Sequence, residues 1–555
     1  MVVSQAWLFR RLRLVTLVLA SVLGLAAGTA VLDLTEPPGP GLDPDAMQYL
    51  GAGAALVRGD GLRIPYAHWD SPDTTSTLAH FPPGFPATIA VGIAAGLTPQ
   101  NSARFVMAVS AAMATAAVLL AAAEGGSLVG GFLAVLILAV TPAMVIVHAS
   151  VLSEPLFLAL FAAFVWQLAR PRGAHGRTIT LGVLAAAATL VRYAGVSLVG
   201  TVLIDAWLGD AWMGSRSTRE RPSLATRARR TAVALAIPLG ALGCWLLLTP
   251  RTGEIRRFAF YGDGFGATLT QGATTLAQWF APGEELARTG AVLAVAVLVA
   301  LTALIVRDVR RVWTAAAAGA PHAASAQRLQ RALGIAKVCY LGVVIASRLF
   351  ADGDIPLDER IVAPLFMLGA LGVGAALVRW WFTARRGPML LTAGITASWV
   401  IASANQSGWW VNIYREDGGD MAAREWRLSP LVDYAAALPR GTSIYSNWPS
   451  ALWFYTQRST RSLPESLSAP VASQFRARLA NERAVLIAFN VATGDAASPD
   501  SLAMLAGLVP VAWWSDGVVW RAPEDAAPPG DSLRAEPLPA MSRVPTGATR
   551  PPRPQ

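Results

Sequence analysis

Lysine, cysteine and charge are scarce in this chain of 555 residues. Only 14% of the residues are charged, whereas an ordinary soluble domain carries roughly a quarter, so the composition argues against a protein that is soluble throughout. The two cysteines, Cys244 and Cys339, both lie in apolar segments, which excludes a disulfide framework and a cysteine zinc site. All but one of the 45 basic residues are arginine, and the exception is Lys337.

Long apolar segments are the main feature of the sequence, in which 54% of the residues are hydrophobic. A helix of about 18–20 nearly uncharged residues can cross a bilayer core of ~30 Å. The stretch 178–207 is long enough for two short helices with a break at Arg192-Tyr193-Ala194-Gly195. The segments predict an all-α polytopic membrane protein with about 11 transmembrane helices. They are 14–32, 103–122, 127–147, 178–207 (twice), 231–249, 289–306, 361–378 and 388–404, with 155–169 and 332–350 as the weakest.

Two apolar segments need a separate interpretation. Residues 84–97 are too short to cross a bilayer and begin at Pro82-Pro83-Gly84, so we interpret them as interfacial or re-entrant. The first apolar segment contains small residues at 26–30 that resemble a signal-peptide cleavage region. A signal h-region has only ~7–15 residues, so we expect an uncleaved anchor instead.

The placement of arginine predicts how the chain is oriented. The formal net charge is +10, but the basic residues lie between apolar runs and not on one amphipathic face, so we expect no nucleic-acid partner. If 178–207 crosses twice and 84–97 does not cross, the positive-inside rule puts the N-terminus and every arginine cluster in the cytosol. The clusters are 10–13, 216–230, 307–331 and 379–386. The segments then expected outside the cytoplasmic membrane are 33–85, 250–288, 351–360 and everything after 405.

The composition changes at about residue 405. Charge is then mixed with short apolar runs, and Asp516-Gly517 between two such runs is a tight-hairpin signal. We expect strands at 442–447, 484–490, 509–514 and 518–520, and helices at 429–438 and 470–480. The predicted domains are a polytopic domain over 1–404, a small extracytoplasmic α/β domain over 405–521 and a disordered Pro-rich tail over 522–555.

Two carboxylates, Asp43 and Asp45, follow the first span in the sequence LDPDAMQYL. Two acids at this spacing could share a divalent cation such as Mg²⁺ or Mn²⁺, or one could act as a general base on a hydroxyl group. The structural alternative is that Asp45 caps a helix that begins with Ala-Met-Gln-Tyr, and that Asp43 is a solvated side chain.

Two other motifs lie at the outer ends of apolar segments. HFPPGFP at 80–86 has the stiff prolines and aromatic rings of an interfacial wall, and His80 could be an acid–base group, although a turn entering the bilayer explains each residue singly. SEPLF at 153–157 places Glu154 at membrane depth, where an acid is costly and usually has a partner or a function. A helix cap above Pro155 is the alternative for Glu154.

A set of arginines is expected near the outer interface. The positive-inside rule makes such arginines unusual, so they call for an anionic partner. A phosphate is one match, because guanidinium binds phosphate through paired, charge-assisted hydrogen bonds. Ion pairs with Glu154, Asp352 or Asp358 explain them equally well. The arginines are Arg192, Arg256, Arg257, Arg348 and Arg360.

Taken in order, these motifs resemble the GT-C glycosyltransferase superfamily, specifically bacterial proteins similar to the dolichyl-phosphate-mannose–protein mannosyltransferases. The resemblance covers most of residues 1–465, and the ordered set is more specific than any single motif. It rests on LDPDAMQYL with RGDGL downstream, HFPPGFP, SEPLF, VRYAG, PLDERIVAP and YSNWPSALWFYTQR.

The resemblance implies an enzyme whose donor is a sugar carried on a polyprenyl phosphate. It assigns the catalytic base to Asp43, with Asp45 as a second acid, and Glu154 is the next candidate for the base. Asp43 and Asp45 are also the expected metal ligands if a divalent cation takes part. The side chains expected to bind the substrates are Tyr49, His80 and Tyr193.

The site of the donor phosphate departs from the pattern of the family. Several members carry a lysine just before the paired prolines, and this chain has Phe81 there. The resemblance then implies that arginine takes over this contact. The arginines expected to bind the donor phosphate are Arg192, Arg256, Arg257 and Arg360.

The chemistry of such a transfer matches the residues. It expels a phosphate and takes a proton from an acceptor hydroxyl, and direct displacement would invert the anomeric centre, as the resemblance implies. We therefore predict an inverting hexosyl- or pentosyltransferase at the outer face of the cytoplasmic membrane, with a glycan, lipid or protein acceptor. The alternative is a non-catalytic multi-span transporter or a lipid-binding envelope-assembly protein, but transporters tend to place polar residues near the midplane.

Cysteine labelling in intact cells tests the predicted topology. We expect an impermeant thiol reagent to label Ser446→Cys, on the outer side, and not Ser217→Cys, in a cytosolic arginine cluster. Labelling of Ser217→Cys but not of Ser446→Cys would overturn this topology.

Overall fold

The fold is described from a computed structural model, which covers residues 5–171, 176–208, 223–248, 259–262, 264–280, 302–316, 318, 320–351, 353, 355–382, 386–491 and 498–525. The chain forms two compact units, which we describe separately. The helical unit comprises residues up to 40, 79–88 and 101–416, and the sheet unit comprises 41–78, 89–100 and 417 onward.

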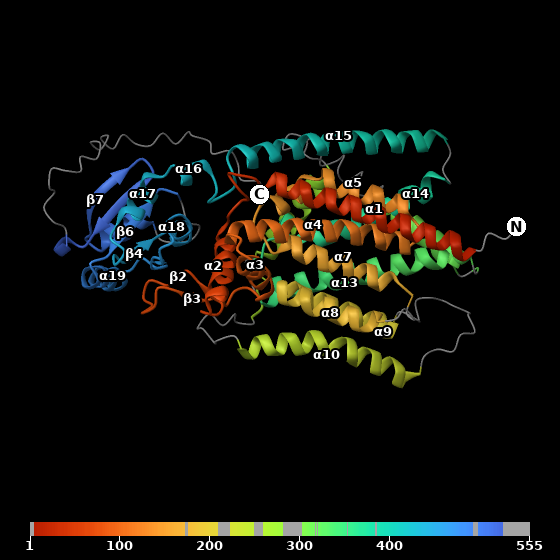
Figure 1. The fold of residues 1–555 in the computed structure, drawn as a ribbon, viewed down its shortest axis with the longest axis horizontal. Helices are drawn as coiled ribbons and strands as arrows, with labels where there is room; N and C mark the ends of the chain where they lie inside the picture. Colours follow the sequence, from red (N-terminus) through yellow and green to blue (C-terminus); the bar gives the residue numbers. More distant parts are fainter. Residues whose placement is uncertain are drawn as a thin grey trace. The chain divides into compact units, whose positions relative to one another are not determined.

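The helical unit is a bundle of apolar helices (Figure 1). Its core is continuous and includes the almost fully buried rings of Phe157, Phe161 and Tyr340. The helices are α1 (Gln5–Leu34), α3 (Gly84–Ala94), α4 (Pro99–Glu124), α5 (Leu128–Val140), α6 (Pro142–Ala149), α7 (Glu154–Ala169), α8 (Arg177–Val191), α9 (Val196–Leu208), α10 (Leu224–Leu248), α11 (Phe265–Phe280), a helix over 302–316, α13 (Pro321–Phe350), α14 (Glu359–Trp381) and α15 (Arg386–Glu416).

Among the described residues, six helices are long and apolar enough to cross a membrane, and the bent pair α5–α6 would make a seventh. The expected count was about 11. The difference arises because α7, α8 and α9, where three further spans were expected, are shorter than the six long helices. The expected span 289–306 lies mostly outside the described residues.

The expected span 127–147 is not one helix. It is broken at Thr141, and its halves α5 and α6 are bent by 66°. Thr141 has extended backbone angles, and Pro142 has no N–H to continue the helical ladder. The break frees the carbonyl of Val140, which accepts a hydrogen bond from the Ser407 hydroxyl of α15 at 2.8 Å. The carbonyl that the break leaves without a helical partner is therefore satisfied by a side chain from a neighbouring helix.

The two helices expected over 178–207 are present as α8 and α9, and the predicted break between them is confirmed. Arg192 leaves the helix with extended backbone angles, and Tyr193–Gly195 form a single 3₁₀ turn. Glycine is required at the end of this turn, because a Cβ on Gly195 would lie 2.4 Å from the backbone of Ala188. Arg177 opens α8 and contacts Asp205 near the end of α9 at 3.3 Å, so the two helices run antiparallel.

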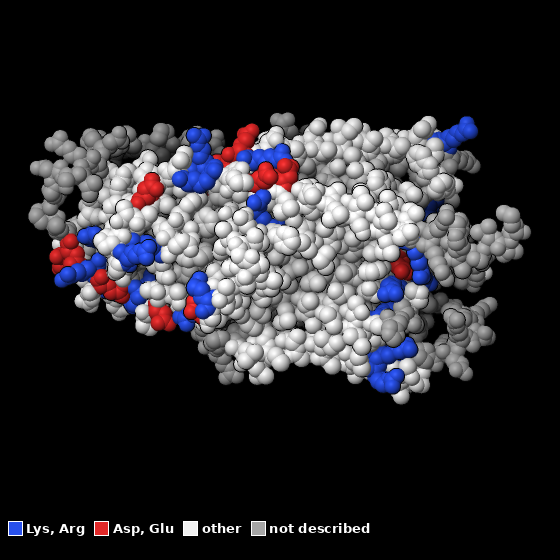
Figure 2. Space-filling view, viewed as in Figure 1, with Lys and Arg blue, Asp and Glu red and all other residues white. Residues whose placement is uncertain are grey.

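Charged side chains gather at the ends of the helices. Arg331 of α13 also binds Asp205, at 3.0 Å, and Arg379 in the last turn of α14 binds Asp308 at 2.5 Å. Figure 2 shows that the middle of the helical unit carries almost no charge on the face drawn. Such an apolar band between charged ends is what a bilayer requires.

Small residues let several helices approach closely. A Cβ on Gly374 of α14 would lie 2.3 Å from the carbonyl oxygen of Gly130 on α5, and a Cβ on Gly24 of α1 would lie 2.8 Å from that of Ala112 on α4. Helices in a membrane associate largely through such close backbone packing, because lipid gives them no hydrophobic driving force.

The sheet unit is built around six strands in the order β2-β5-β4-β6-β8-β7. The first four strands are parallel, and β8 and β7 add antiparallel pairs around the expected Asp516-Gly517 turn. Each strand and helix expected after residue 405 is confirmed. These are β4 (Ile444–Ser446), β6 (Val485–Phe489), β7 (Val509–Trp514), β8 (Gly517–Arg521), α17 (Pro430–Ala437) and α19 (Ala469–Glu482), beside the further elements α16 (Arg424–Arg427), α18 (Pro449–Thr456), β5 (Thr460–Arg461), α20 (Pro499–Leu505) and η2 (Pro523–Asp525).

The first loop belongs to the same compact unit as the C-terminal residues. Its strand β2 (Tyr66–Ala67) is the edge of the six-stranded sheet and pairs in parallel with β5. Its other elements are α2 (Pro44–Arg58) and the paired strands β1 (Arg63–Ile64) and β3 (Ser76–Thr77). The boundary expected at 404/405 lies inside α15, which continues to Glu416, and the tail from 526 onward lies outside the described residues.

The burial of Ser446 changes the labelling experiment. Ser446 is fully buried in β4, so a cysteine there would not react even in an outward-facing domain. Ser466 is exposed in the same unit and is the better position for the outer label. Cys244 and Cys339 are first replaced by serine, so that only the introduced thiol can react.

The contact between α5 and α14 gives a stability test. We expect Gly374→Ala to lower the thermal midpoint of the purified protein in detergent, because overpacking a tight contact costs about 1–3 kcal/mol. Gly369→Ala is the matched control in α14, since nothing lies within 4 Å of a Cβ there. Alanine at 369 should be neutral or stabilising by up to about 1 kcal/mol. Equal midpoints for the two variants would contradict the close packing.

Candidate functional site

Asp43 forms the N-cap of α2. Its carboxylate accepts a hydrogen bond from the Ala46 N–H at 2.7 Å, and Pro44 takes the first helical position, where no N–H is needed. The structural alternative, with Asp45 as the cap and Asp43 as a solvated side chain, is wrong in its choice of cap, because the helix begins at Pro44. Asp45 lies in the first turn of α2, where its charge suits the helix dipole. Both carboxylates are half-buried.

The backbone beside these acids is tied to the C-terminal part of the sheet unit. The Leu42 N–H donates to the Gly419 carbonyl at 3.1 Å, and the Met421 N–H donates to the Leu42 carbonyl at 3.0 Å. Tyr49, which we expected to contact a substrate, is 1% exposed, so its ring packs inside the unit and lies away from the surface. The position of Asp43 is therefore fixed both by its own cap and by the strand-like pairing of Leu42.

His80 and the paired prolines lie where α3 begins in the helical unit. His80 is exposed and stands edge-to-face against Phe81 at 4.6 Å. A Cβ on Gly84 would lie 2.6 Å from the carbonyl oxygen of Leu190, so the start of α3 packs directly on the end of α8. With 11 residues, α3 agrees with the expectation that 84–97 does not cross.

Glu154, Arg192 and Arg360 come together in the helical unit. Glu154 Oε1 lies 2.6 Å from Arg192 Nη1 and 2.8 Å from Arg360 Nε, and Arg192 Nη1 also donates to Ser153 Oγ at 3.1 Å. The Glu154 side chain is 2% exposed, whereas those of Arg192 and Arg360 are 18% and 27% exposed. The accessible part of this cluster therefore belongs to the two arginine side chains and not to Glu154.

Three different helices supply this charged cluster. Glu154 opens α7, Arg192 ends α8 at the predicted break, and Arg360 lies in the first turn of α14. Asp358 caps α14 by accepting from the Ile361 N–H at 3.0 Å, and Tyr340 Oη donates to the Ile361 carbonyl at 2.8 Å. These bonds hold the first turn of α14, and thereby Arg360, in place.

The other expected site residues of the helical unit have structural partners. Tyr193 Oη accepts a hydrogen bond from the Trp245 indole at 3.2 Å. Arg348 donates to Thr268 Oγ1 at 3.1 Å and to the Tyr261 carbonyl at 3.3 Å, so it joins α13 both to α11 and to the segment before it. Arg256 and Arg257 lie outside the described residues.

A metal site at Asp43 and Asp45 would need a third ligand. Within the ranges that the structure covers, no group of three or more histidine, cysteine, aspartate or glutamate side chains could hold a metal ion.

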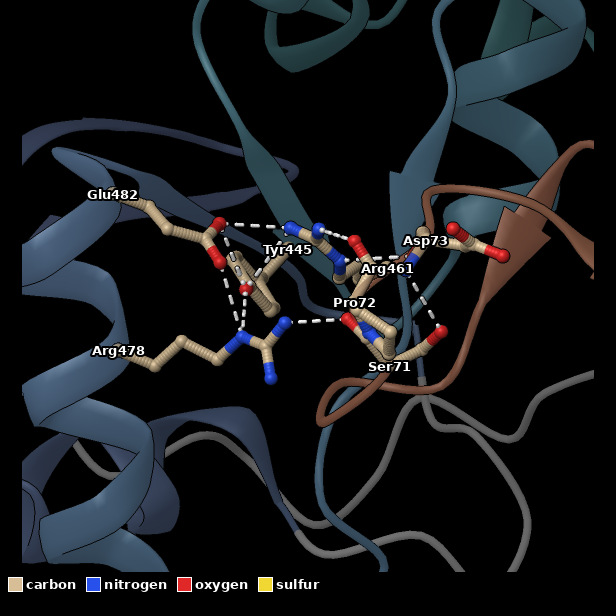
Figure 3. Close-up of polar contacts among 7 residues, drawn as sticks. All are labelled: Ser71, Pro72, Asp73, Tyr445, Arg461, Arg478 and Glu482. Atoms are coloured by element: carbon tan, nitrogen blue, oxygen red, sulfur yellow. Dashed lines mark hydrogen bonds and ion pairs between the residues drawn. The ribbon is translucent and has the colours of Figure 1, made fainter.

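One polar cluster of the sheet unit was missed in the sequence (Figure 3). Four side chains bind one another in this cluster: Arg461, Arg478, Glu482 and Tyr445. The two arginines also donate to backbone carbonyls of the first loop. Their spacing in the sequence carries no motif, and only the i, i+4 pair of Arg478 and Glu482 on a helix could have pointed to part of it.

Neither a protein-family model nor a curated protein sequence matches the chain. Solved structures do match it. ArnT from Cupriavidus metallidurans bound to undecaprenyl phosphate is 14% identical with a TM-score of 0.55, and the match covers 92% of this chain and 99% of that one. The archaeal oligosaccharyltransferase AglB from Archaeoglobus fulgidus, in complex with an inhibitory peptide and a dolichol-phosphate, is 12% identical with a TM-score of 0.53 over 87% of this chain and 70% of that one.

A third solved structure agrees with these two. The arabinofuranosyltransferase AftD from Mycobacteria is 15% identical with a TM-score of 0.52, and the match covers 95% of this chain but only 40% of that one. All three are GT-C glycosyltransferases. The chain therefore has the GT-C fold, and the resemblance seen in its motifs is confirmed at the level of the fold.

The Glu154 cluster predicts a large effect of one substitution on stability. Glu154→Gln leaves two guanidinium groups without their shared carboxylate, so we expect a loss of about 1–3 kcal/mol, the usual cost of an unsatisfied buried polar group. Thermal unfolding in detergent measures this effect. Glu416→Gln, at an exposed position of the same unit, should stay within about 0.5 kcal/mol of the wild type. A similar midpoint for both variants would show that the cluster does not stabilise the bundle.

Proposed function

We propose that the protein is an inverting glycosyltransferase that moves a sugar from a polyprenyl-phosphate donor to an acceptor at the outer face of the cytoplasmic membrane. The observation that carries the proposal is the cluster of Glu154, Arg192 and Arg360 in a chain with the GT-C fold. Two of the matching structures are described as bound to undecaprenyl phosphate or dolichol-phosphate, which supports a lipid-phosphate donor here.

In this proposal Arg192 and Arg360 bind the donor phosphate. Both arginine side chains are partly exposed while the Glu154 side chain between them is buried, and guanidinium groups bind phosphate through paired, charge-assisted hydrogen bonds. Glu154 holds both arginines at fixed positions before the donor arrives. His80 and Tyr193 are the side chains that we propose for further substrate contacts.

The proposed general base is Asp43. The acceptor hydroxyl oxygen attacks the anomeric carbon, the bond between that carbon and the phosphate oxygen breaks, and the hydroxyl proton passes to the carboxylate. The phosphate leaves with the bonding electrons, and displacement from the opposite side inverts the anomeric centre. The acceptor that supplies this hydroxyl is a glycan, a lipid or a protein.

The membrane orientation is part of the proposal. The end of the helices that carries Glu154, Arg192 and Arg360 would face the outside, and the end that carries Arg177, Arg331 and Arg379 would face the cytosol. The first loop and the C-terminal residues form one compact unit, so they are expected on the same side.

A transporter is the second candidate, and the broken pair α5–α6 is the feature that favours it. In transporters the unwound backbone at such a break coordinates a substrate or an ion. Here the freed carbonyl of Val140 already accepts a hydrogen bond from Ser407, which makes the break a packing feature.

Sugar transfer by Asp43→Asn tests the proposed function. Asparagine is as good an N-cap as aspartate, so α2 should stay intact while the basic carboxylate is lost. We expect the transfer rate from a labelled polyprenyl-phosphate sugar to fall about 10²–10⁴-fold, with an unchanged thermal midpoint.

Asp45→Asn is the matched control, two positions further along in the first turn of the same helix. It should have a much smaller effect on transfer if Asp43 alone takes the proton. Near wild-type transfer by Asp43→Asn would move the base elsewhere, with Glu154 next in line. Absence of transfer by the wild-type protein with every lipid-phosphate sugar offered would reject the enzyme.

A further inference from the structure

Two arginines from the C-terminal part of the sheet unit donate hydrogen bonds to three consecutive backbone carbonyls of the first loop (Figure 3). Arg478 of α19 donates to the Ser71 carbonyl. Arg461 of β5 donates to the Pro72 carbonyl at 3.2 Å and to the Asp73 carbonyl at 3.3 Å. We call this set the carbonyl clamp. It joins segments 388 to 407 positions apart in the chain through hydrogen bonds from charged donors, which are stronger than those between neutral groups.

A rigid scaffold aims both guanidinium groups at the loop. Glu482 accepts from Arg461 Nη1 at 2.7 Å and from Arg478 Nε at 3.1 Å. The buried Tyr445 hydroxyl donates to Glu482 at 3.1 Å and accepts from Arg478 at 2.9 Å and from Arg461 at 3.2 Å. The Arg461 guanidinium also lies over the Tyr445 ring, 5.5 Å from its centre. Both arginines are thus oriented by the C-terminal residues before they meet the loop.

The clamped loop is in turn packed against α2. Asp73 and Thr75 bind the Arg63 side chain, and Arg63 pairs with Thr77 where β1 and β3 lie antiparallel. Pro65, between β1 and β2, touches α2 so closely that a Cβ on Gly51 would lie 2.4 Å from it. A displacement of the loop at the carbonyl clamp would therefore be transmitted to α2 through the paired strands β1 and β3 and through Pro65.

Two other contacts complete the attachment. The Trp69 ring packs edge-to-face on Phe475 of the C-terminal core, with centres 6.0 Å apart. At the start of α2, the backbone of Leu42 is paired with Gly419 and Met421. The start of the helix that Asp43 caps and the first loop that follows this helix are thereby both attached to residues after 416.

We infer that Arg461 and Arg478 are positioning residues, which fix α2 and its N-cap Asp43 in the place that transfer requires. This inference rests on the proposed function of Asp43. The two arginines touch neither donor nor acceptor in this assignment, and they act through the first loop.

The Glu482 carboxylate that orients the two arginines is ionised at neutral pH. Burial by itself raises the pKa of Glu482, but Arg461, the Tyr445 hydroxyl and Arg478 outweigh it and hold that pKa below its usual range. A depressed pKa means that the carboxylate stabilises the folded unit above the unfolded pKa, and that this stabilisation is lost as the pH falls through the folded pKa. Glu482→Gln imitates the protonated state without a change of pH.

Amide hydrogen exchange on the full-length protein gives the first test. We expect Arg478→Gln to speed exchange in residues 44–58 and 63–78 by about tenfold to a hundredfold, because a charged hydrogen bond that holds the loop is lost. Glu482→Gln should do the same to a smaller extent, and it is the fallback if Arg478→Gln does not fold. Arg476→Gln is the matched control on α19, since the Arg476 side chain is 40% exposed and binds only Glu524 among the described residues.

Transfer kinetics give the second test. We expect Arg478→Gln to lower kcat by about tenfold to a hundredfold, as misplaced catalytic groups do, with the donor KM unchanged. Arg478→Lys should recover only part of kcat, because an ammonium group cannot bridge the loop carbonyl, Tyr445 and Glu482 together. A mainly structural loss would instead lower the amount of active protein and leave kcat per active site unchanged.

The two readouts separate the possible failures. Normal exchange in 44–58 for a folded Arg478→Gln variant overturns the clamp, whatever the activity. Faster exchange with an unchanged kcat overturns the positioning role. If the wild-type protein transfers no sugar, the proposed function fails, and the positioning role fails with it, while the exchange data still decide whether the clamp holds the loop.

Discussion

A charged side chain inside an apolar helix bundle has to be neutralised by a partner, and the helical unit depends on this constraint at both ends. Glu154 lies between Arg192 and Arg360, and Asp205 lies between Arg177 and Arg331. In each case one buried carboxylate gathers arginines from two other helices. Burying an unpaired charge costs several kcal/mol, so each carboxylate dictates which helix ends can meet. The same constraint that specifies the bundle thus creates a small region rich in guanidinium at the end that we propose faces the donor.

Much of the fold could be predicted because it depends on local signals. Long apolar segments gave the helices, and the polar sequence at Arg192–Gly195 gave the break between α8 and α9. The Asp516-Gly517 turn gave the β7–β8 hairpin. The cap at Asp43 was within reach as well, since proline at 44 marks the first helical position and the preceding aspartate as the cap. The apolar pattern begins only after Asp45, and for this reason Asp45 resembles the cap in the sequence.

The rest depends on partners that are distant in the sequence. No local pattern indicates that Arg192 and Arg360 share one carboxylate. Arginine is also the residue expected both for an ion pair and for binding a phosphate, so the residue type does not distinguish the two roles. The break at Thr141 depends on whether a neighbouring helix can satisfy the freed carbonyl, and Ser407 lies 267 positions away from Val140. Strand β2 has two residues, too few for any periodic signal, and it is defined only by its pairing with β5.

The long separation between β2 and β5 also orders the folding of the chain. Residues 41–78 are synthesised early, but their backbone partners at Gly419, Met421 and Ser462 follow only after the whole helical unit. The first loop therefore cannot bury its strand until the last helix has been made, and until then its N–H and C=O groups are left to water. The acid proposed as the base consequently reaches its final position only when the C-terminal residues fold around it. A membrane enzyme assembled in this order would acquire its catalytic geometry last, after every span is in place.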